Sequence, residues 1–376
     1  MENNLIGKSL GELQALCEAE GMPKYAARQM SDWLYAKNVG DIDAMTNLSL
    51  KTRAILKGKY TIVRRPPVDC QVSVDGTKKY IFEVACQSVA GSTAQTCPAG
   101  LVETVFIPDG DRATLCVSSQ VGCRMGCRFC VTGSGGFHGN LPAAEILNQI
   151  FSVPEFPQLT NIVYMGMGEP FDNYEAVMRS IEVLTSGWGL AWSPHRITVS
   201  SVGHLAGVER FVRESPCRLA ISLHTPYADE RAEIMPMQRK YPLADVVRLL
   251  KQYDWTGQRR LSFEYIMFGA LNDDLKHADA LVQLLKPLPC RVNLIRFHNS
   301  PGMPFRTSER ENMQKFADYL CNRGLRCTIR ASRGEDIMAA CGLLAGTKKT
   351  TAQLSKSPHC GPDLPACPPA GLITNH

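Results

Sequence analysis

The sequence predicts an α/β protein built around a partial (β/α)6 barrel that follows a small helical N-terminal domain. From residue 114 onward, apolar strand-like segments alternate with segments of helical periodicity. Near-continuous apolar strands that alternate with helices indicate a parallel sheet covered on its faces. The chain before residue 60 instead shows only helical periodicity. Six strand–helix units are too few for a closed eight-stranded barrel, so the sheet is expected to stay open on one side.

The amino-terminal 60 residues contain three segments with apolar residues at helical spacing, which Gly21 and Gly40 interrupt. Residues 51–65 carry six basic residues and no acidic one. Such a run can neutralise phosphates without reading sequence, but it can equally be the solvated face of a helix. The segment therefore leaves both interpretations open.

The strand candidates come in two groups. Residues 78–84 and 101–108 are strand-like, and the Ser-, Thr-, Gly- and Ala-rich stretch 86–100 between them is expected to be a surface insertion. The barrel strands are expected at 114–119, 161–168, 196–201, 217–223, 261–268 and 292–297, with a later addition at 327–332. The predicted domains are a helical domain at 1–65, a strand-rich connector at 66–105, a barrel at 106–346 and a disordered tail at 347–376.

Composition indicates a cytoplasmic protein. The N-terminus has no apolar core like that of a secretory signal, and no stretch of about 18 apolar residues could cross a membrane. The chain has 15 cysteines, an odd number that is spread along its length. Thiols stay reduced in the cytoplasm, so a disulfide bond there is expected to be transient and catalytic. We expect a monomer without a membrane partner.

Three cysteines at Cys123, Cys127 and Cys130 have the spacing C-x3-C-x2-C, just after the first barrel strand. Three thiolates suit a [4Fe–4S] cluster, and a set of three leaves the fourth iron without a protein ligand. An open iron can bind a small molecule and pass it an electron. The alternatives are a zinc knuckle, with His138 as a fourth ligand, or buried structural thiols.

The wider motif pattern resembles a known family. C-x3-C-x2-C is the signature of radical S-adenosylmethionine (SAM) enzymes. Cys116 lies seven residues before Cys123, and RGEDIMAACGLLAG surrounds Cys341. This frame resembles the RlmN and Cfr family of RNA adenine methyltransferases, and the resemblance extends from about Leu10 to Gly346. It implies that residues 1–65 form an RNA-binding accessory domain and that residues 106–346 form a catalytic radical SAM barrel. It also implies a [4Fe–4S] cluster and two molecules of SAM for each turnover.

Polar residues at the ends of successive predicted strands correspond to the SAM contacts of this family. Each of them can instead simply satisfy a strand end or a core hydrogen bond, but together they favour one pocket. The residues are Gly168 and Glu169, Ser200, then Ser222, Leu223 and His224, and finally Asn299. The family commonly has proline after that asparagine, whereas this chain has Ser300.

The resemblance also implies roles for three further residues. Cys341 corresponds to the cysteine that takes a methyl group from SAM, since a thiolate is a strong nucleophile. Cys116 corresponds to the cysteine that helps to deprotonate the RNA adduct and then forms a disulfide with Cys341. Glu103 corresponds to an acidic residue with the same proposed role as proton acceptor, and the sequence does not choose between the two. Without the family, Cys116 would be expected to be a small hydrophobic residue of a strand.

The implied function is methylation of C2 of an adenosine in the peptidyl-transferase region of 23S rRNA and of the adenosine beside the anticodon in tRNA. The electron donor is expected to be a flavodoxin or a ferredoxin. The alternatives are a Cfr-type C8 methyltransferase of 23S rRNA that confers antibiotic resistance, and a non-catalytic, zinc-stabilised RNA-binding protein. In the tail, His359, Cys360 and Cys367 offer a metal-binding alternative to disorder.

Overall fold

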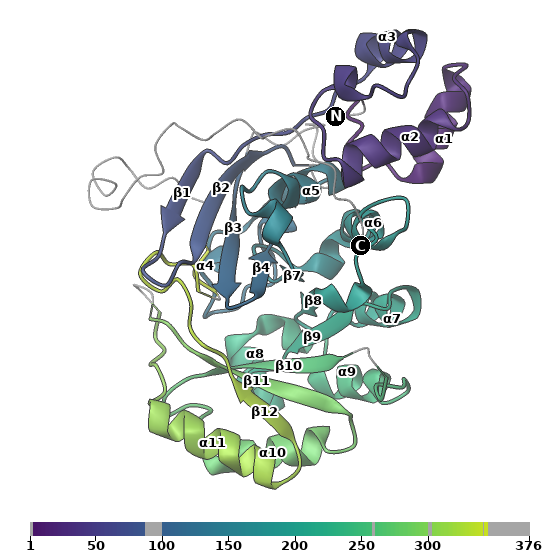
Figure 1. The fold of residues 1–376 in the computed structure, drawn as a ribbon. Helices are drawn as coiled ribbons and strands as arrows, with labels where there is room; N and C mark the ends of the chain where they lie inside the picture. Colours follow the sequence, from purple (N-terminus) through teal and green to yellow (C-terminus); the bar gives the residue numbers. More distant parts are fainter. Residues whose placement is uncertain (1–2, 87–99, 258–259, 300–302, 341, 345–376) are drawn as a thin grey trace.

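The fold consists of a helical amino-terminal region and a large curved sheet with helices on its outer face (Figure 1). It comes from a computed structural model that describes residues 3–86, 100–257, 260–299, 303–340 and 342–344. The 86–100 insertion, apart from its two ends, and the tail from residue 345 lie outside the described residues.

The predicted N-terminal helical region is confirmed. Ser9 begins the first helix with reciprocal bonds, because its Oγ accepts from the Glu12 N–H at 3.2 Å and the Glu12 carboxylate accepts from the Ser9 N–H at 2.7 Å. The three α-helices of this region are α1 (Leu10–Ala19), α2 (Ala26–Ser31) and α3 (Leu50–Lys59). Their buried side chains join the main hydrophobic core, so this region packs on the rest of the chain.

The central sheet has ten strands in the order β1-β2-β3-β4-β7-β8-β9-β10-β11-β12. Strands β1 to β4 pair antiparallel, and every pair from β4·β7 to β11·β12 is parallel. The strands of this sheet are β1 (Asp69–Val72), β2 (Lys78–Val84), β3 (Gly100–Asp109), β4 (Arg112–Cys116), β7 (Asn161–Tyr164), β8 (Ile197–Ser201), β9 (Arg218–Ser222), β10 (Leu261–Met267), β11 (Cys290–Arg296) and β12 (Arg326–Ile329).

The parallel part confirms the predicted barrel strands, although β4, β7 and β12 end three or four residues before their predicted ends. The second barrel strand ends at Tyr164, four residues before its predicted end, because the chain turns into a glycine-containing loop there. The sequence prediction also missed β1 and a separate antiparallel pair, β5 (Gln120–Gly122) and β6 (Phe137–Asn140). That pair flanks the loop that carries Cys123, Cys127 and Cys130, which we call the cysteine loop. The strands of the pair are too short to show a clear alternation of apolar and polar residues.

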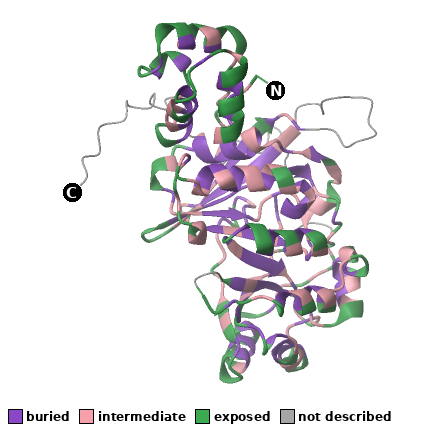
Figure 2. Ribbon diagram, turned by 90° about the vertical axis from the view of Figure 1, so that its right-hand side faces the viewer, coloured by how far each residue is buried: buried purple, intermediate pink, exposed green. Residues whose placement is uncertain are grey.

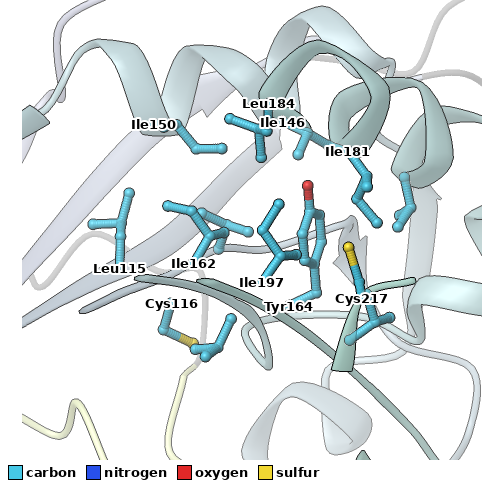
Figure 3. Packing of buried hydrophobic residues seen from close by; sticks show 14 of the residues in the cluster. Leu115, Cys116, Ile146, Ile150, Ile162, Tyr164, Ile181, Leu184, Ile197 and Cys217 are labelled. Atoms are coloured by element: carbon cyan, nitrogen blue, oxygen red, sulfur yellow. The ribbon is translucent and has the colours of Figure 1, made fainter. Parts of the chain in front are cut away.

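Helices cover the outer face of the sheet (Figure 2). Figure 3 shows Leu115 of β4 pointing toward Ile146 and Ile150, while the neighbouring Cys116 points to the opposite side of the strand. The α-helices here are α4 (Val131–Ser134), α5 (Ala143–Phe151), α6 (Tyr174–Thr185), α7 (Leu205–Glu214), α8 (Ala228–Ile234), α9 (Leu243–Leu250), α10 (Leu275–Leu285) and α11 (Arg310–Asn322). Shorter helical turns are η1 (Asp32–Ala36), η2 (Ile42–Ala44), η3 (Phe156–Gln158), η4 (Pro170–Asn173), η5 (Pro194–Arg196) and η6 (Pro236–Arg239).

The chain after β12 connects the last strand to the β1–β2 hairpin. The Gly334 N–H donates to the Asp75 carboxylate at 3.0 Å, and Ser73 Oγ donates to Asp336 at 2.5 Å. Arg333 forms an ion pair with Asp109 at 2.8 Å. These contacts carry the chain from the end of β12 toward the cysteine loop. Among the described residues, no helix is long and apolar enough to span a membrane.

Candidate active site

A cavity of about 510 Å³ lies on the inner face of the barrel sheet. It reaches the carboxyl ends of the parallel strands, where chemistry gathers in barrels of this kind. Nine of the residues predicted from the sequence line it: Cys116, Cys123, Cys127, Cys130, Gly168, Glu169, Ser200, Ser222 and His224.

The cysteine loop is held by backbone bonds to three different parts of the chain. The Cys123 N–H donates to Gly136 O at 2.8 Å, the Arg128 N–H to Ile234 O at 2.9 Å, and the Val131 N–H to Gly342 O at 2.7 Å. The loop is therefore positioned by the residue before β6, by the end of α8 and by the chain after β12.

The environment of the cysteines suits a cationic cofactor. Burial raises the pKa of Cys123 to about 12 and raises that of Cys127 well above its usual value. A buried thiol becomes a thiolate when a metal supplies the compensating positive charge. In the described part of the chain, no group of three or more His, Cys, Asp or Glu is gathered closely enough to hold a metal ion. Three thiolates that each bind a different iron of one cluster need not converge on a single ion. The donor set and its burial thus fit a cluster.

The Cys116 side chain lines the cavity and points away from the helices that cover the sheet (Figure 3). Cys116 is the last residue of β4, pairs in register with Val163 of β7 and Val105 of β3, and is 9% exposed. Its side chain lies on the inner face of the sheet (Figure 3). A thiol at this position can approach a molecule bound in the cavity.

Cys341 itself lies outside the described residues, but both of its neighbours line the cavity. Ala340 and Gly342 belong to its wall, and Thr132 Oγ1 donates to Leu344 O at 2.6 Å. Gly342 has a φ of +84°, a conformation that side-chain-bearing residues rarely adopt. The segment that contains Cys341 is thus tied directly to the cysteine loop.

Glu103 does not line the cavity. It is 2% exposed on β3, and its carboxylate forms an ion pair with Lys79 of β2 at 3.5 Å. Both side chains are nearly fully buried. A buried carboxylate with a lysine partner is stabilised in its charged form.

Glu169 is a buried acid in the cavity wall. Its Oε2 accepts from the Val202 N–H at 2.9 Å and its Oε1 from the Phe171 N–H at 3.2 Å. Burial raises the pKa of Glu169 to about 7, although these hydrogen bonds oppose the shift. The preceding Gly168 has a φ of +101°, and a Cβ there would lie 2.6 Å from the Gln120 side chain. The backbone turn therefore requires glycine to aim the carboxylate.

His224 follows β9 and has a defined tautomer. Its Nδ1 accepts from the Ile266 N–H at 3.0 Å, so the proton of the neutral ring resides on Nε2. Burial, and then the charge of Arg231, lower the pKa of His224 to about 3. The ring is thus a neutral hydrogen-bond donor at physiological pH. The ring of Phe129, within the cysteine loop, packs edge-on against it at 4.8 Å between centroids.

Two predicted SAM contacts lie elsewhere. Leu223 is fully buried and is not part of the cavity wall; its N–H donates to Glu264 O at 2.9 Å. Asn299 lines a neighbouring cavity of about 250 Å³, whose wall includes His298. His298 also lines the larger cavity, so the two spaces share a wall residue.

Arg231, which is 1% exposed on α8, was not indicated by any sequence pattern. Its guanidinium donates to Leu223 O at 3.1 Å, Ser222 O at 2.8 Å and Val202 O at 2.8 Å, and to the Gln238 side chain at 2.6 Å. This one side chain thus joins the carboxyl ends of β8 and β9. Its partners are backbone carbonyls that follow from the fold, so no local motif could identify it.

Glu264 of β10 lines the cavity and was likewise not predicted from the sequence. Its carboxylate accepts from Ser262 at 2.9 Å and Asn293 at 2.8 Å, and Arg330 lies 3.5 Å away. These polar side chains make the middle of the barrel interior hydrophilic.

The basic run of residues 51–65 is mostly engaged within the protein. Lys57 pairs with an aspartate and Lys59 with a glutamate, each within 2.6 Å. Arg65 pairs with Glu145 at 2.6 Å, and Arg64 donates to Leu34 O at 2.9 Å. Most basic side chains of this run are therefore paired within the protein and do not form a free phosphate-binding surface.

Comparison with known proteins identifies the family. Residues 3–62 match the family described as "Ribosomal RNA large subunit methyltransferase N-terminal domain", and residues 117–284 match the radical SAM superfamily. A probable dual-specificity RNA methyltransferase RlmN of Porphyromonas gingivalis is 50% identical over 94% of this chain and 100% of its own length.

Two further comparisons agree. The dual-specificity RNA methyltransferase RlmN of Syntrophus aciditrophicus is 40% identical over 91% of this chain and 96% of its own. The crystal structure of a radical SAM methyltransferase from Sphaerobacter thermophilus superposes with a TM-score of 0.82 at 38% identity, covering 92% of this chain and 99% of that one. The chain described here belongs to the RlmN family of radical SAM RNA methyltransferases.

Proposed function

We propose that this enzyme methylates C2 of an adenosine in the peptidyl-transferase region of 23S rRNA, and of the adenosine beside the anticodon in tRNA. The observation that carries the proposal is the wall of one cavity. It combines the three loop cysteines, Cys116 and both neighbours of Cys341. A cysteine triad together with two further cysteines is the set that methyl transfer through a methylated cysteine requires.

The three loop cysteines would hold a [4Fe–4S] cluster. When bound, the cluster and SAM supply the radical that removes a hydrogen atom from a methyl group. The polar strand ends would hold SAM: the Glu169 carboxylate accepts from its ammonium group, and Ser200 and Ser222 offer hydroxyl groups. The Nε2–H of His224 would donate a hydrogen bond to SAM.

The remaining chemistry belongs to two cysteines. Cys341 would take a methyl group from a first SAM by displacement, since the adenine carbon C2 is electron-poor and cannot attack SAM itself. The methylene group on the Cys341 sulfur would add to C2 as a radical, which joins the RNA to Cys341, and Cys116 would then remove the proton from C2. Cleavage of the C–S bond to Cys341 would release the RNA, whose new methyl group takes up a proton. The Cys341 sulfur would join that of Cys116 in a transient disulfide, and the one surplus electron would leave to the bound cluster. The position of Cys116 in the cavity wall favours it over Glu103, which is paired with Lys79.

The other parts have supporting roles. We propose that residues 1–65 form an RNA-binding accessory domain, that residues 66–105 connect it to a catalytic barrel over 106–346, and that the enzyme works as a cytoplasmic monomer. An external donor such as flavodoxin or ferredoxin would supply electrons.

Nucleoside mass spectrometry tests the proposal. Anaerobically reconstituted enzyme, SAM and a reductant are incubated with a 23S rRNA fragment or tRNA, and the RNA is digested. The expected product is 2-methyladenosine in both RNAs. A product that contains only 8-methyladenosine would instead assign the Cfr-type reaction.

A further inference from the structure

The amino-terminal ends of the barrel strands carry arginines on the inner face of the sheet. Side chains on a strand alternate between faces with a period of two. Ser222 lines the cavity, so Arg218, four residues earlier on β9, faces the same interior. Arg291 has the same relation to Ile295 on β11. We call the set at this end the arginine collar: Arg112, Arg218, Arg260, Arg291 and Arg326.

The collar residues are close enough to affect one another. Arg291 and Arg326 are direct partners in the register of β11 and β12. The Leu219 N–H donates to Arg260 O at 3.1 Å, which places Arg260 beside the start of β9. Burial, and then the charges of Arg260, Arg112 and Arg291 in that order, lower the pKa of Arg218. The collar is therefore one concentrated region of positive charge.

Within the described residues, none of the five collar side chains forms an ion pair with a carboxylate. Arg112 donates to the neutral Asn161 side chain at 3.1 Å. The Nε of Arg218 is buried and has no hydrogen-bond partner. Arginines on the outer helices differ, since Arg213 and Arg248 each pair with an acidic residue within 2.8 Å. Converging guanidinium groups without carboxylates are suited to phosphate oxygens.

The collar lies between the accessory region and the active-site cavity. The loop before β8 receives hydrogen bonds from the accessory helices, from Ser31 to Trp188 O and from Arg28 to Gly187 O at 2.7 Å. That loop ends at the same edge of the sheet as the collar, because it leads into the start of β8. At its other side, Arg112 is itself part of the cavity wall that contains Cys116. A polyanion held by the accessory region and the cavity would pass over the collar.

We propose that the arginine collar binds phosphates of the RNA substrate and so fixes the RNA strand whose target base enters the cavity. This inference rests on the proposed function. It adds a contact surface that is formed by the barrel itself and is distinct from the basic run of residues 51–65, most of which is paired internally.

The salt dependence of RNA binding tests the proposal. The logarithm of the binding constant falls linearly with the logarithm of salt concentration, with a slope of about 0.7 per single-strand phosphate contact. The double variant R218Q/R291Q, which removes two such contacts, should lower the magnitude of this slope by about 1.4. The variant R248Q, which removes an exposed and already paired arginine on α9, should leave the slope unchanged. Thermal unfolding of both variants is measured alongside.

The outcomes separate this inference from the proposed function. If the wild-type enzyme methylates RNA but a folded R218Q/R291Q variant keeps the full slope, the collar does not bind RNA and only this inference fails. If inorganic triphosphate binding is lost in the variant without a change in the RNA slope, the collar is a small-anion site and the proposal is overturned. A loss only in the rate of reduction by an acidic donor protein also overturns it. If the wild-type enzyme methylates no RNA, the proposed function fails first.

Discussion

The Glu169 carboxylate accepts a hydrogen bond from the Val202 N–H at 2.9 Å and thereby links the turn after β7 to the turn after β8. The same Val202 offers its carbonyl to Arg231 at 2.8 Å. Two buried ionisable side chains thus hold one backbone position at the cavity edge. The position of the predicted SAM ligands depends on this arrangement.

Gly168 should not tolerate a side chain. In G168A the Cβ would meet the backbone nitrogen of Gln120 at 2.9 Å, and the φ of +101° disfavours alanine. We expect the free energy of unfolding to fall by about 2–4 kcal/mol. Urea denaturation measures the loss. The matched variant G58A, in helix α3 with nothing within 4 Å of the added Cβ, should instead gain about 0.5–1 kcal/mol. Equal stability of G168A and wild type would contradict the predicted strain.

Stability should depend on the protonation of Glu169. Its pKa in the folded chain is about 7, above the ordinary value of 4.5, so the folded state binds this proton more tightly than the unfolded state. Wild type therefore loses stability as pH rises from 4.5 to about 7, and E169Q lacks this loss. The stability of E169Q relative to wild type, both free of cluster and SAM, should rise by about 2 kcal/mol between pH 5 and pH 8. A pH-independent difference would contradict the raised pKa.

Arg231 should be essential to the cavity edge. R231M removes a guanidinium that is 1% exposed and leaves three backbone carbonyls without that donor. Breaking such a buried charged network costs about 3–5 kcal/mol. Thermal unfolding measures this loss, and R239Q, on the neighbouring turn η6, serves as a control that should change little. Native-like stability of R231M would show that the strand ends do not need this link.

Cys116 should be needed for product release and not for the earlier steps. In C116A, methylation of Cys341 and addition to the RNA can still occur, so a covalent RNA–protein species should accumulate. Denaturing gel electrophoresis with labelled RNA detects it. The exposed Cys321 provides the control, since C321A should release RNA as wild type does. Clean release of methylated RNA by C116A would remove Cys116 from its proposed role.

Periodicity and motif spacing predicted much of this protein. The parallel strands, the helical region and the cysteine loop follow from patterns that are local in sequence. The hydrogen bonds of Arg231 could not be predicted, because they go to backbone carbonyls at the carboxyl ends of β8 and β9, which lie outside the local pattern of α8. The Lys79–Glu103 ion pair depends on strand register, which the sequence does not specify. The basic run of residues 51–65 looked like a free RNA-binding surface in the sequence because the acidic residues that pair with it, such as Glu20 and Glu145, are distant in sequence.

The cysteine triad is the central claim, and its most direct test is iron and sulfide analysis of the protein purified without oxygen and supplied with both elements. We predict about four irons for each chain, and a strong loss of iron in C127A but not in C321A. Protein that binds no iron under these conditions, or C127A that binds as much iron as wild type, would contradict the account.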